Sequence, residues 1–291
     1  MKDHLIIATA AGDSVRIYAA LATEVVETAR RIHDTWPTAT AALGRVLIGT
    51  LMLGVMNDGL HRLTVDFTGD GPMGKILAVS NQRGVVKGYP ANSQVDLNLN
   101  PDGKLDVAGA VGKGFLSVLK DLGLKEPYQG IVPLQSGEVA EDFAFYFTKS
   151  EQTPSAVALG VLVNAIGNVK AAGGLIVQLM PGYEERTAAL LEPKLSRIAN
   201  LSADLDAGIT PVQLIKEICA DFNDLKFLEE AVIRYECDCS RERFRGPLLS
   251  LGREELGDIL KEHGVIEVRC HFCNNVYHYH EAELFETDQS G

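Results

Sequence analysis

Four of the five cysteines in this 291-residue chain lie in its last quarter, in two close pairs. Cys237 and Cys239 form a C-x-C pair, and Cys270 and Cys273 form a C-x-x-C pair further along the chain. Two thiols on one tight turn can reach the same ion, and four thiolates complete the tetrahedral shell of a structural zinc ion. The spacing therefore predicts one zinc ion per chain, bound by these four side chains.

A zinc site explains the paired cysteines better than burial in a core or permanent disulfides do. Ordinary buried cysteines are not expected in two close pairs flanked by Arg and Asp. Permanent disulfides would imply an oxidising compartment, but the N-terminal run MKDHLIIATAAGDS has a short apolar part that breaks at Gly12-Asp13, which is typical of a hairpin turn rather than a signal peptide. We therefore expect a cytoplasmic protein with thiols that bind metal.

The residues between and after the two cysteine pairs must bring the sulfurs together. Residues 239–252 and 253–264 are expected to form two short helices, and residues 265–270 a strand. The second pair then begins a turn that leads into a strand over residues 276–280, so that strand, turn and strand make a zinc-ribbon-like hairpin. His271, His278 and His280 lie nearby, but four thiolates already complete the site, so we place these histidines outside the ligand set.

The composition is that of a soluble globular protein. It has 46% hydrophobic and 23% charged residues, and the length suggests about two domains. The formal net charge is −12, and residues 237–291 hold eleven acidic side chains against six Lys and Arg. A zinc ribbon that binds nucleic acid would be expected to carry a basic face for phosphate contacts, so the charge argues against that class.

One apolar run, residues 39–56, is close to the length that spans a bilayer. It contains Arg45 and three glycines, and Thr38 and Asn57 are typical of a helix start and a helix end. We interpret it as the buried central helix of a domain, with Thr38 as its N-cap.

The first 181 residues predict an α+β domain with a mostly antiparallel sheet and helices packed to one side. A hairpin is expected over residues 4–20, followed by a helix from Thr23 to His33 and by the buried helix. Residues 112–123 are expected to form a short helix, and propensity does not decide between helix and strand for residues 138–152. The other expected strands are residues 63–67, 75–80, 85–89, 128–134, 157–163 and 175–180.

After Pro181-Gly182 the pattern predicts helices alone. Thr210 and Pro211 are typical of a helix cap and first turn, and Cys219 is expected to be a small buried hydrophobic residue. This segment has too little apolar content for an independent domain and is expected to pack on the sheet domain. The predicted organisation is a core domain over residues 1–181, a helical linker over 182–232 and a zinc-binding redox-switch domain over 233–291.

Two motifs resemble those of enzymes. The run Gly69-Asp-Gly-Pro-Met-Gly74 matches G-x-G-x-x-G, but a strand follows it where phosphate binding needs the N-terminus of a helix. A thioredoxin-like C-x-x-C opens a helix, whereas Cys273 leads into a strand. We find no convincing pair of nucleophile and base, and we expect no enzymatic activity.

The chain resembles the redox-regulated bacterial heat-shock chaperone family, the thirty-three kilodalton chaperonin. The resemblance covers nearly the whole chain and is carried by CDCSRER, VRCHFCNNVYHY, QLMPG, TWPTATAALGRVL and GDGPMGKILAVSNQRGVVKGY. It implies a cytosolic, ATP-independent holdase of the oxidative stress response, which is inactive when reduced and zinc-bound. It also implies that oxidation forms the disulfides Cys237–Cys239 and Cys270–Cys273, releases the zinc and activates a homodimer that binds unfolded or oxidatively damaged clients.

The residues are consistent with such a switch. A domain as small as residues 233–291 buries too little apolar surface to be robust alone, while structural zinc contributes an apparent folding free energy of about 10–16 kcal/mol in such units. Arg234, Arg241, Arg243 and Arg269 favour the thiolate form. Two alternatives stay open at this point: a zinc-ribbon nucleic-acid-binding protein and a thiol-disulfide oxidoreductase. Partners on a membrane or on nucleic acid are not expected.

Overall fold

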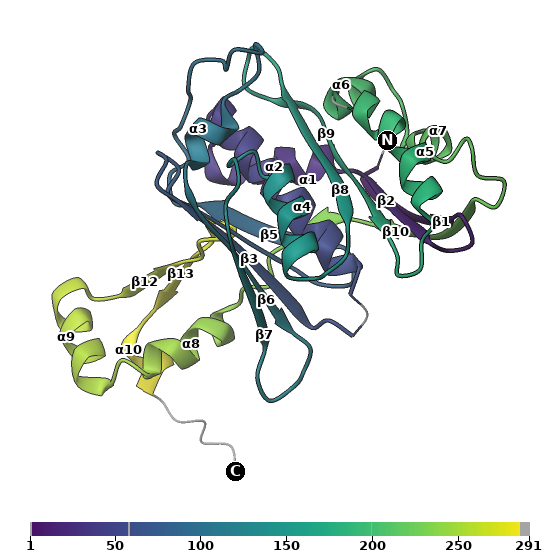
Figure 1. Cartoon of the computed structure of the whole chain (residues 1–291). Helices are drawn as coiled ribbons and strands as arrows, with labels where there is room; N and C mark the ends of the chain where they lie inside the picture. Colours follow the sequence, from purple (N-terminus) through teal and green to yellow (C-terminus); the bar gives the residue numbers. More distant parts are fainter. Residues whose placement is uncertain (1, 58, 199, 286–291) are drawn as a thin grey trace. The chain divides into compact units, whose positions relative to one another are not determined.

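The computed structural model describes residues 2–57, 59–198 and 200–285 (Figure 1). Contacts within the chain divide it into two compact units, residues 1–236 and residues 237–291. Each unit has its own buried core, and the two are described separately below.

The centre of the large unit is helix α2 (Pro37–Val55), which is buried on almost every side. This is the one helix among the described residues that is long and apolar enough to cross a membrane, and 94% of its apolar window is buried inside the unit. A helix that is hydrophobic all round requires burial on all sides. The expectation of a buried central helix is confirmed.

Two sheets enclose α2, where the sequence predicted one sheet with helices to one side. The first has the order β10-β1-β2-β9-β8 and the second has the order β11-β5-β4-β3-β6-β7. The first sheet comprises β1 (His4–Ala10), β2 (Val15–Leu21), β8 (Ser155–Val163), β9 (Val169–Leu179) and β10 (Lys226–Val232). The second comprises β3 (Arg62–Gly69), β4 (Lys75–Ser80), β5 (Val85–Pro90), β6 (Gly114–Asp121), β7 (Tyr128–Pro133) and β11 (Arg234–Tyr235). All pairings are antiparallel except that of β11 with β5.

The helices form two layers around the first sheet (Figure 1). Helices α1 (Thr23–His33), α2 and α4 (Ala140–Lys149) share one core with both sheets, and the short α3 (Val107–Val111) also contributes to it. On the other face of the first sheet lie α5 (Glu185–Leu195), a short 3-10 turn (Ser196–Ile198), α6 (Leu201–Asp206) and α7 (Pro211–Ile218). The architecture is α+β and mostly antiparallel, as predicted.

The segment 182–232 packs on the first sheet through apolar side chains of its helices, including Leu191, Leu205 and Ile215. Thr210 caps α7 with Pro211 in the first turn, as predicted. The carboxylate of Asp224 accepts hydrogen bonds from the backbone N–H groups of Ala11 and Gly12 (2.9 and 2.5 Å), and these bonds hold the pKa of Asp224 below its usual value. The segment is therefore attached to the sheet by both apolar and polar contacts.

Three local predictions are wrong. Residues 112–123 hold strand β6 instead of a helix, because alternate side chains such as Leu116 and Val118 face the core while the strand pairs with β3 and β7. Residues 226–232 form strand β10 within the segment expected to be helical, because they complete the free edge of β1. Trp36 rather than Thr38 is the N-cap of α2, and the Thr38 hydroxyl instead donates to Asp96 at 3.0 Å.

The glycine-rich run at residues 69–74 is a hairpin turn between β3 and β4. The N–H of Gly69 donates to the carbonyl of Gly74 (2.8 Å), and Gly74 has a φ of +64°. A Cβ atom on Gly69 would lie 1.9 Å from the carbonyl oxygen of Val111, so the turn needs glycine where α3 ends against it. No helix begins at this turn, which leaves a phosphate without the N-terminal dipole of the nucleotide-binding motifs.

Glycine-to-alanine substitutions in two helices are expected to change stability in opposite directions. In α2, a Cβ on Gly49 would lie 2.3 Å from the ring of Phe143, which is fully buried and packs edge-on against Phe67. Overpacking of this kind costs about 1–3 kcal/mol, against a helix-propensity gain of about 1 kcal/mol. We therefore expect Gly49→Ala to lower the urea midpoint of the large unit, followed by the fluorescence of its one tryptophan.

The matched control is Gly257→Ala, in a helix of the small unit where a Cβ would meet nothing within 4 Å. Only the propensity gain applies there, so hydrogen exchange in that helix should slow. A stabilising Gly49→Ala substitution would contradict the close packing of α2 against α4.

Candidate metal centre

The four paired cysteines come together in the small unit. Their sulfur atoms all lie within 4.8 Å of one another, and this is the one such cluster of potential metal ligands among the described residues. The Sγ atoms of Cys237 and Cys270 are 3.7 Å apart, and those of Cys239 and Cys273 are 3.3 Å apart. All five cysteines of the chain are free thiols in this structure.

The C-x-x-C pair is held by a hairpin whose turn is tightly hydrogen-bonded. Strands β12 (Ile266–Arg269) and β13 (Val276–Tyr279) pair antiparallel. In the turn, the N–H of Cys270 donates to the carbonyl of Asn275 (2.9 Å), and the N–H of Asn274 donates back to the carbonyl of Cys270 (2.8 Å). Asn274 takes a left-handed φ of +59°, a conformation that Asn tolerates better than most residues. The turn folds the two thiols back toward the same point.

The C-x-C pair lies just before helix α8 (Arg241–Leu249), whose N-terminus is capped by Ser240. Arg241, the first residue of this helix, holds the pair against the hairpin. Its guanidinium donates to the carbonyl of His278 (2.7 Å) and forms an ion pair with Glu283, and it lies 4.9 Å from the centre of the Tyr279 ring. The Tyr279 hydroxyl donates in return to the carbonyl of Arg241 (2.8 Å).

The rest of the small unit has only a small apolar core. Its core cluster of buried residues, among those that the structure describes, has five members, drawn from helix α9 (Arg253–His263), β12, β13 and α10 (Glu281–Phe285). They are Leu256, Leu260, Ile266, Tyr279 and Leu284. The expected order of two helices, strand, turn and strand is confirmed, and α10 was not anticipated.

The spacing of the sulfurs fits a tetrahedral thiolate site. A Zn–S bond of about 2.3 Å corresponds to an S–S edge of about 3.8 Å in a regular tetrahedron. The two measured S–S distances, 3.7 and 3.3 Å, are close to that edge. Soft thiolate ligands in this arrangement suit zinc and exclude calcium and magnesium, which require oxygen ligands. The four cysteines could therefore hold one metal ion.

Protonation of the thiols depends on burial and on hydrogen bonds. Burial raises the pKa of Cys237, and it raises the pKa of Cys273 to about 11. Burial acts in the same direction on Cys239, but hydrogen bonds from Tyr277 and from the neighbouring thiols outweigh it, so the pKa of Cys239 is lowered. Burial and hydrogen bonding therefore act unequally on these three thiols, whereas a bound divalent ion would stabilise the thiolate form of all four cysteines.

Tyr277 is a residue of the site that the sequence did not reveal. Its hydroxyl lies 3.0 Å from the sulfur of Cys239 and 3.2 Å from the carbonyl oxygen of the same residue. The available signal was its position on the strand after the C-x-x-C turn, two residues from the buried Tyr279. A hydroxyl that donates to a thiolate stabilises the charge on the sulfur.

The other candidate residues lie elsewhere. His271, His278 and His280 are exposed and contribute no atom to the sulfur cluster. Cys219 is 2% exposed in the core of the large unit beside α7, and burial raises the pKa of its thiol to about 11. The C-x-x-C pair sits in a turn between two strands and does not open a helix, which differs from the thioredoxin arrangement.

Comparisons with known proteins agree over nearly the whole chain. Residues 3–280 match the family described as "Hsp33 protein". The "33 kDa chaperonin" of Geobacillus kaustophilus is 49% identical over 99% of this chain and 98% of its own length, and the protein of the same name from Bacillus subtilis is 45% identical over 97% of each chain. The crystal structure of the 33 kDa chaperonin (heat shock protein 33 homolog) from Thermotoga maritima superposes with a TM-score of 0.90 at 40% identity, covering 98% of this chain and 97% of that one.

These relatives are named as chaperonins, and no enzymatic reaction appears in their names. Full-length matches at this identity, together with the same fold, establish kinship. The chain belongs to the Hsp33 family of chaperones.

Proposed function

We propose that this protein is a redox-regulated, ATP-independent holdase that binds unfolding proteins and prevents their aggregation. In the reduced form Cys237, Cys239, Cys270 and Cys273 would bind one zinc ion, and the chaperone would be inactive. The observation that carries this proposal is the cluster of four sulfurs within 4.8 Å, in a unit whose core cluster has five buried members in the part that the structure describes. The stability of such a unit would depend on a bound ion, and the thiolates that bind the ion are oxidisable.

Oxidation would remove the ligands. Two thiolates, one peroxide molecule and two protons give one disulfide and two molecules of water, so two peroxide molecules would convert all four ligands. We propose the pairs Cys237–Cys239 and Cys270–Cys273, following the resemblance to the family. The C-x-C disulfide closes a small strained ring, so we expect Cys270–Cys273 to form first. Peptide mapping would distinguish this pairing from Cys237–Cys270 and Cys239–Cys273, whose sulfurs are also close.

Loss of zinc would then change the large unit through the covalent connection at residues 233–237. Cys237 follows β11 by two residues, and β11 is held by the Tyr235 hydroxyl, which donates to the carbonyl of Gly88 (2.9 Å) and lies 3.2 Å from His33 Nε2. Just before it, Ile233 is 3% exposed. We propose that unfolding of residues 233–291 frees this end of the 182–232 linker and exposes apolar surface to clients, while the acidic charge keeps the complexes soluble.

The cellular location, the clients and the oligomeric state are proposed from the resemblance to the family. We propose a cytoplasmic location, unfolded or oxidatively damaged proteins as clients, and a homodimer in the oxidised form. The acidic small unit disfavours a zinc-ribbon nucleic-acid-binding protein, since it lacks an excess of cations for phosphates. The turn position of the C-x-x-C pair disfavours a thiol-disulfide oxidoreductase. No nucleic-acid or membrane partner is proposed.

Reduced protein is expected to contain one zinc ion per chain, because the four sulfurs form a single tetrahedral cluster. Replacing any one of the four cysteines with serine should weaken zinc retention against a chelator, whereas Cys219→Ser should retain zinc because its thiol lies in a different core. Metal analysis on the purified proteins measures both. A zinc content of zero or two, or equal loss in Cys219→Ser, would contradict the assignment.

Tyr277→Phe is expected to lower zinc affinity by about tenfold, since removing a hydrogen bond to a metal ligand typically costs 10–100-fold. The variant keeps the ring and its contact with Phe244, whose centre is 5.4 Å away. Competition with a chromophoric chelator gives the affinity. Tyr279→Phe is the matched control, because its hydroxyl contacts the carbonyl of Arg241 and no sulfur. Equal affinities in the Tyr277 variant and the parent protein would show that the hydroxyl does not act on the thiolate.

Removing residues 233–291 should produce a holdase that needs no oxidant. The cut follows Val232, so that strand β10 is kept while the contacts of Ile233 and Tyr235 that hold this end of the linker are lost. Aggregation of a chemically unfolded client, followed by light scattering, measures the activity, with the reduced full chain as control. Hydrogen exchange of residues 182–232 in the full chain, before and after peroxide, tests the release of the linker. A folded truncation without activity, together with unchanged exchange in the linker, would refute the proposed mechanism.

A further inference from the structure

Strand β8 is an edge strand of the first sheet. It pairs with β9 along one side, and among the described residues no strand or side chain bonds to the backbone groups along its other side. The free groups can be identified. The N–H of Leu179 donates to the carbonyl of Pro154 (3.0 Å), and in an antiparallel pair the bonded residues alternate.

This alternation, with the register Ser155 opposite Gln178, directs the even-numbered residues of β8 toward β9. The odd-numbered residues direct N–H and C=O to the free edge. The pairing of β2 with β9 is consistent with this assignment. The N–H of Met180 donates to the carbonyl of Ser14 (2.8 Å), so the even-numbered residues of β9 bond to β2 and its odd-numbered residues bond to β8. Leu159 and Val161 therefore present unpaired donors and acceptors at the edge.

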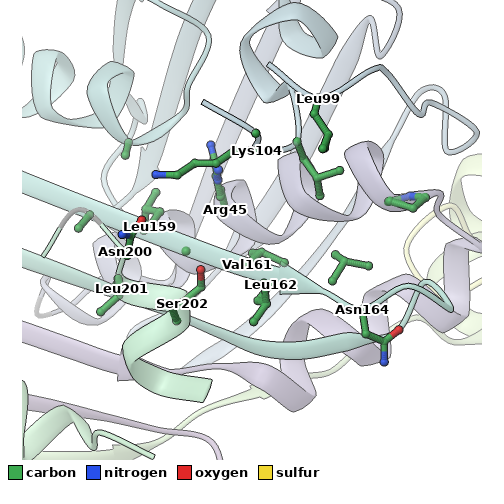
Figure 2. A pocket seen from close by; sticks show the side chains of 18 of the residues that line it. Arg45, Leu99, Lys104, Leu159, Val161, Leu162, Asn164, Asn200, Leu201 and Ser202 are labelled. Atoms are coloured by element: carbon green, nitrogen blue, oxygen red, sulfur yellow. The ribbon is translucent and has the colours of Figure 1, made fainter. Parts of the chain in front are cut away.

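The free edge forms the floor of a slot (Figure 2). A cavity of about 800 Å³ runs along residues 158–165. Arg45, Leu99 and Lys104 lie on one side of β8, and Asn200, Leu201 and Ser202 lie on the other. The second wall comes very close, because a Cβ atom on Gly160 would lie 2.7 Å from the backbone nitrogen of Ser202.

The walls decide what can pair with this edge. A second folded sheet would need open space on both faces of β8, whereas a single extended chain needs only the slot. The main chain of an unfolded polypeptide carries the complementary donors and acceptors, and strand addition to a free edge is a general mode of peptide binding. Leu99, which is exposed, and Leu162, which is half-buried, also offer apolar contacts to a bound chain, so apolar segments would be preferred.

We propose that the slot along β8 binds one extended apolar segment of an unfolded polypeptide, which adds to the first sheet as a further strand. This inference rests on the proposed holdase function and names a binding site for its clients. The wall at Asn200–Ser202 belongs to the 182–232 linker, so loosening of that linker would widen the slot. Binding should therefore be tighter after oxidation.

The test uses the full chain, reduced and after peroxide, with a synthetic peptide of about seven alternating valine and threonine residues, which is shorter than the nine-residue strand β8. Hydrogen exchange read by NMR should show new protection at the amides of Leu159 and Val161, with little change at Gly160 and Leu162, which already bond to β9. A peptide with N-methyl groups at alternate residues cannot donate along one edge and should bind about tenfold more weakly.

Val161→Pro supplies a protein variant, because proline removes the outward N–H at a place where an edge strand tolerates it. Val161→Ala loses the same side-chain packing but keeps the N–H, and is the matched control. The proline variant should bind the peptide about tenfold more weakly than the alanine variant.

Three results would overturn the inference: no amide protection in either redox form, equal binding of the N-methylated peptide, or protection without peptide that rises with protein concentration, which would indicate a second copy of this chain at the edge. The peptide measurements are independent of the aggregation assay. An oxidised chain that suppresses aggregation without protecting these amides would refute this site alone, and a chain that binds the peptide but fails in the aggregation assay would refute the holdase proposal alone.

Discussion

The convergence of four sulfurs is the constraint on which the small unit depends. Ordering a residue costs about 1–2 kcal/mol in backbone entropy, and the five side chains of the core cluster in the described range 237–285 cannot offset that cost by burial alone. The hydrogen-bonded turn at Cys270 and the contacts of Arg241 direct the thiols to one point, but they are few. A cation at that point would add the missing free energy and would also relieve the crowding of four ionisable sulfurs.

The large unit, in contrast, has two extensive apolar cores. In the first, α2 is packed between the two sheets, and the second lies between the first sheet and the helices of residues 182–218. These helices nevertheless depend on the sheet, since they have an apolar face toward it and a charged face outward. The chain thus joins a large unit with an extensive core to a small unit that could hold a metal ion, through a segment whose helices pack on the sheet of the large unit. That arrangement suits a protein in which a chemical change at one end alters the order of the middle.

The sequence predicted the candidate site better than it predicted the fold. Cysteine spacing is a local signal with a chemical meaning, so the clustering of the four cysteines and the hairpin around them could be inferred without tertiary information. The strand at residues 114–121 could not, because Phe115 and Leu119 interrupt the polar face and leave the alternation ambiguous until β3 and β7 are placed beside it. Strand β10 is exposed along most of its length and is defined by its pairing with β1. Tyr277 was missed for a similar reason, since its contact with Cys239 spans the hairpin and the C-x-C arm.

The pairing of β10 with β1 also bears on how the chain is made. His4 lies opposite Val232 in that ladder, so β1 leaves the ribosome long before the strand that covers its outer edge. Contacts of such large sequence separation form slowly, and an uncovered edge is prone to pair wrongly in the interval. Glu229 and Glu230 bring charge to the strand that finally closes the edge. During synthesis this chaperone therefore passes through a state with the same unpaired strand edge that makes nascent and damaged proteins aggregate.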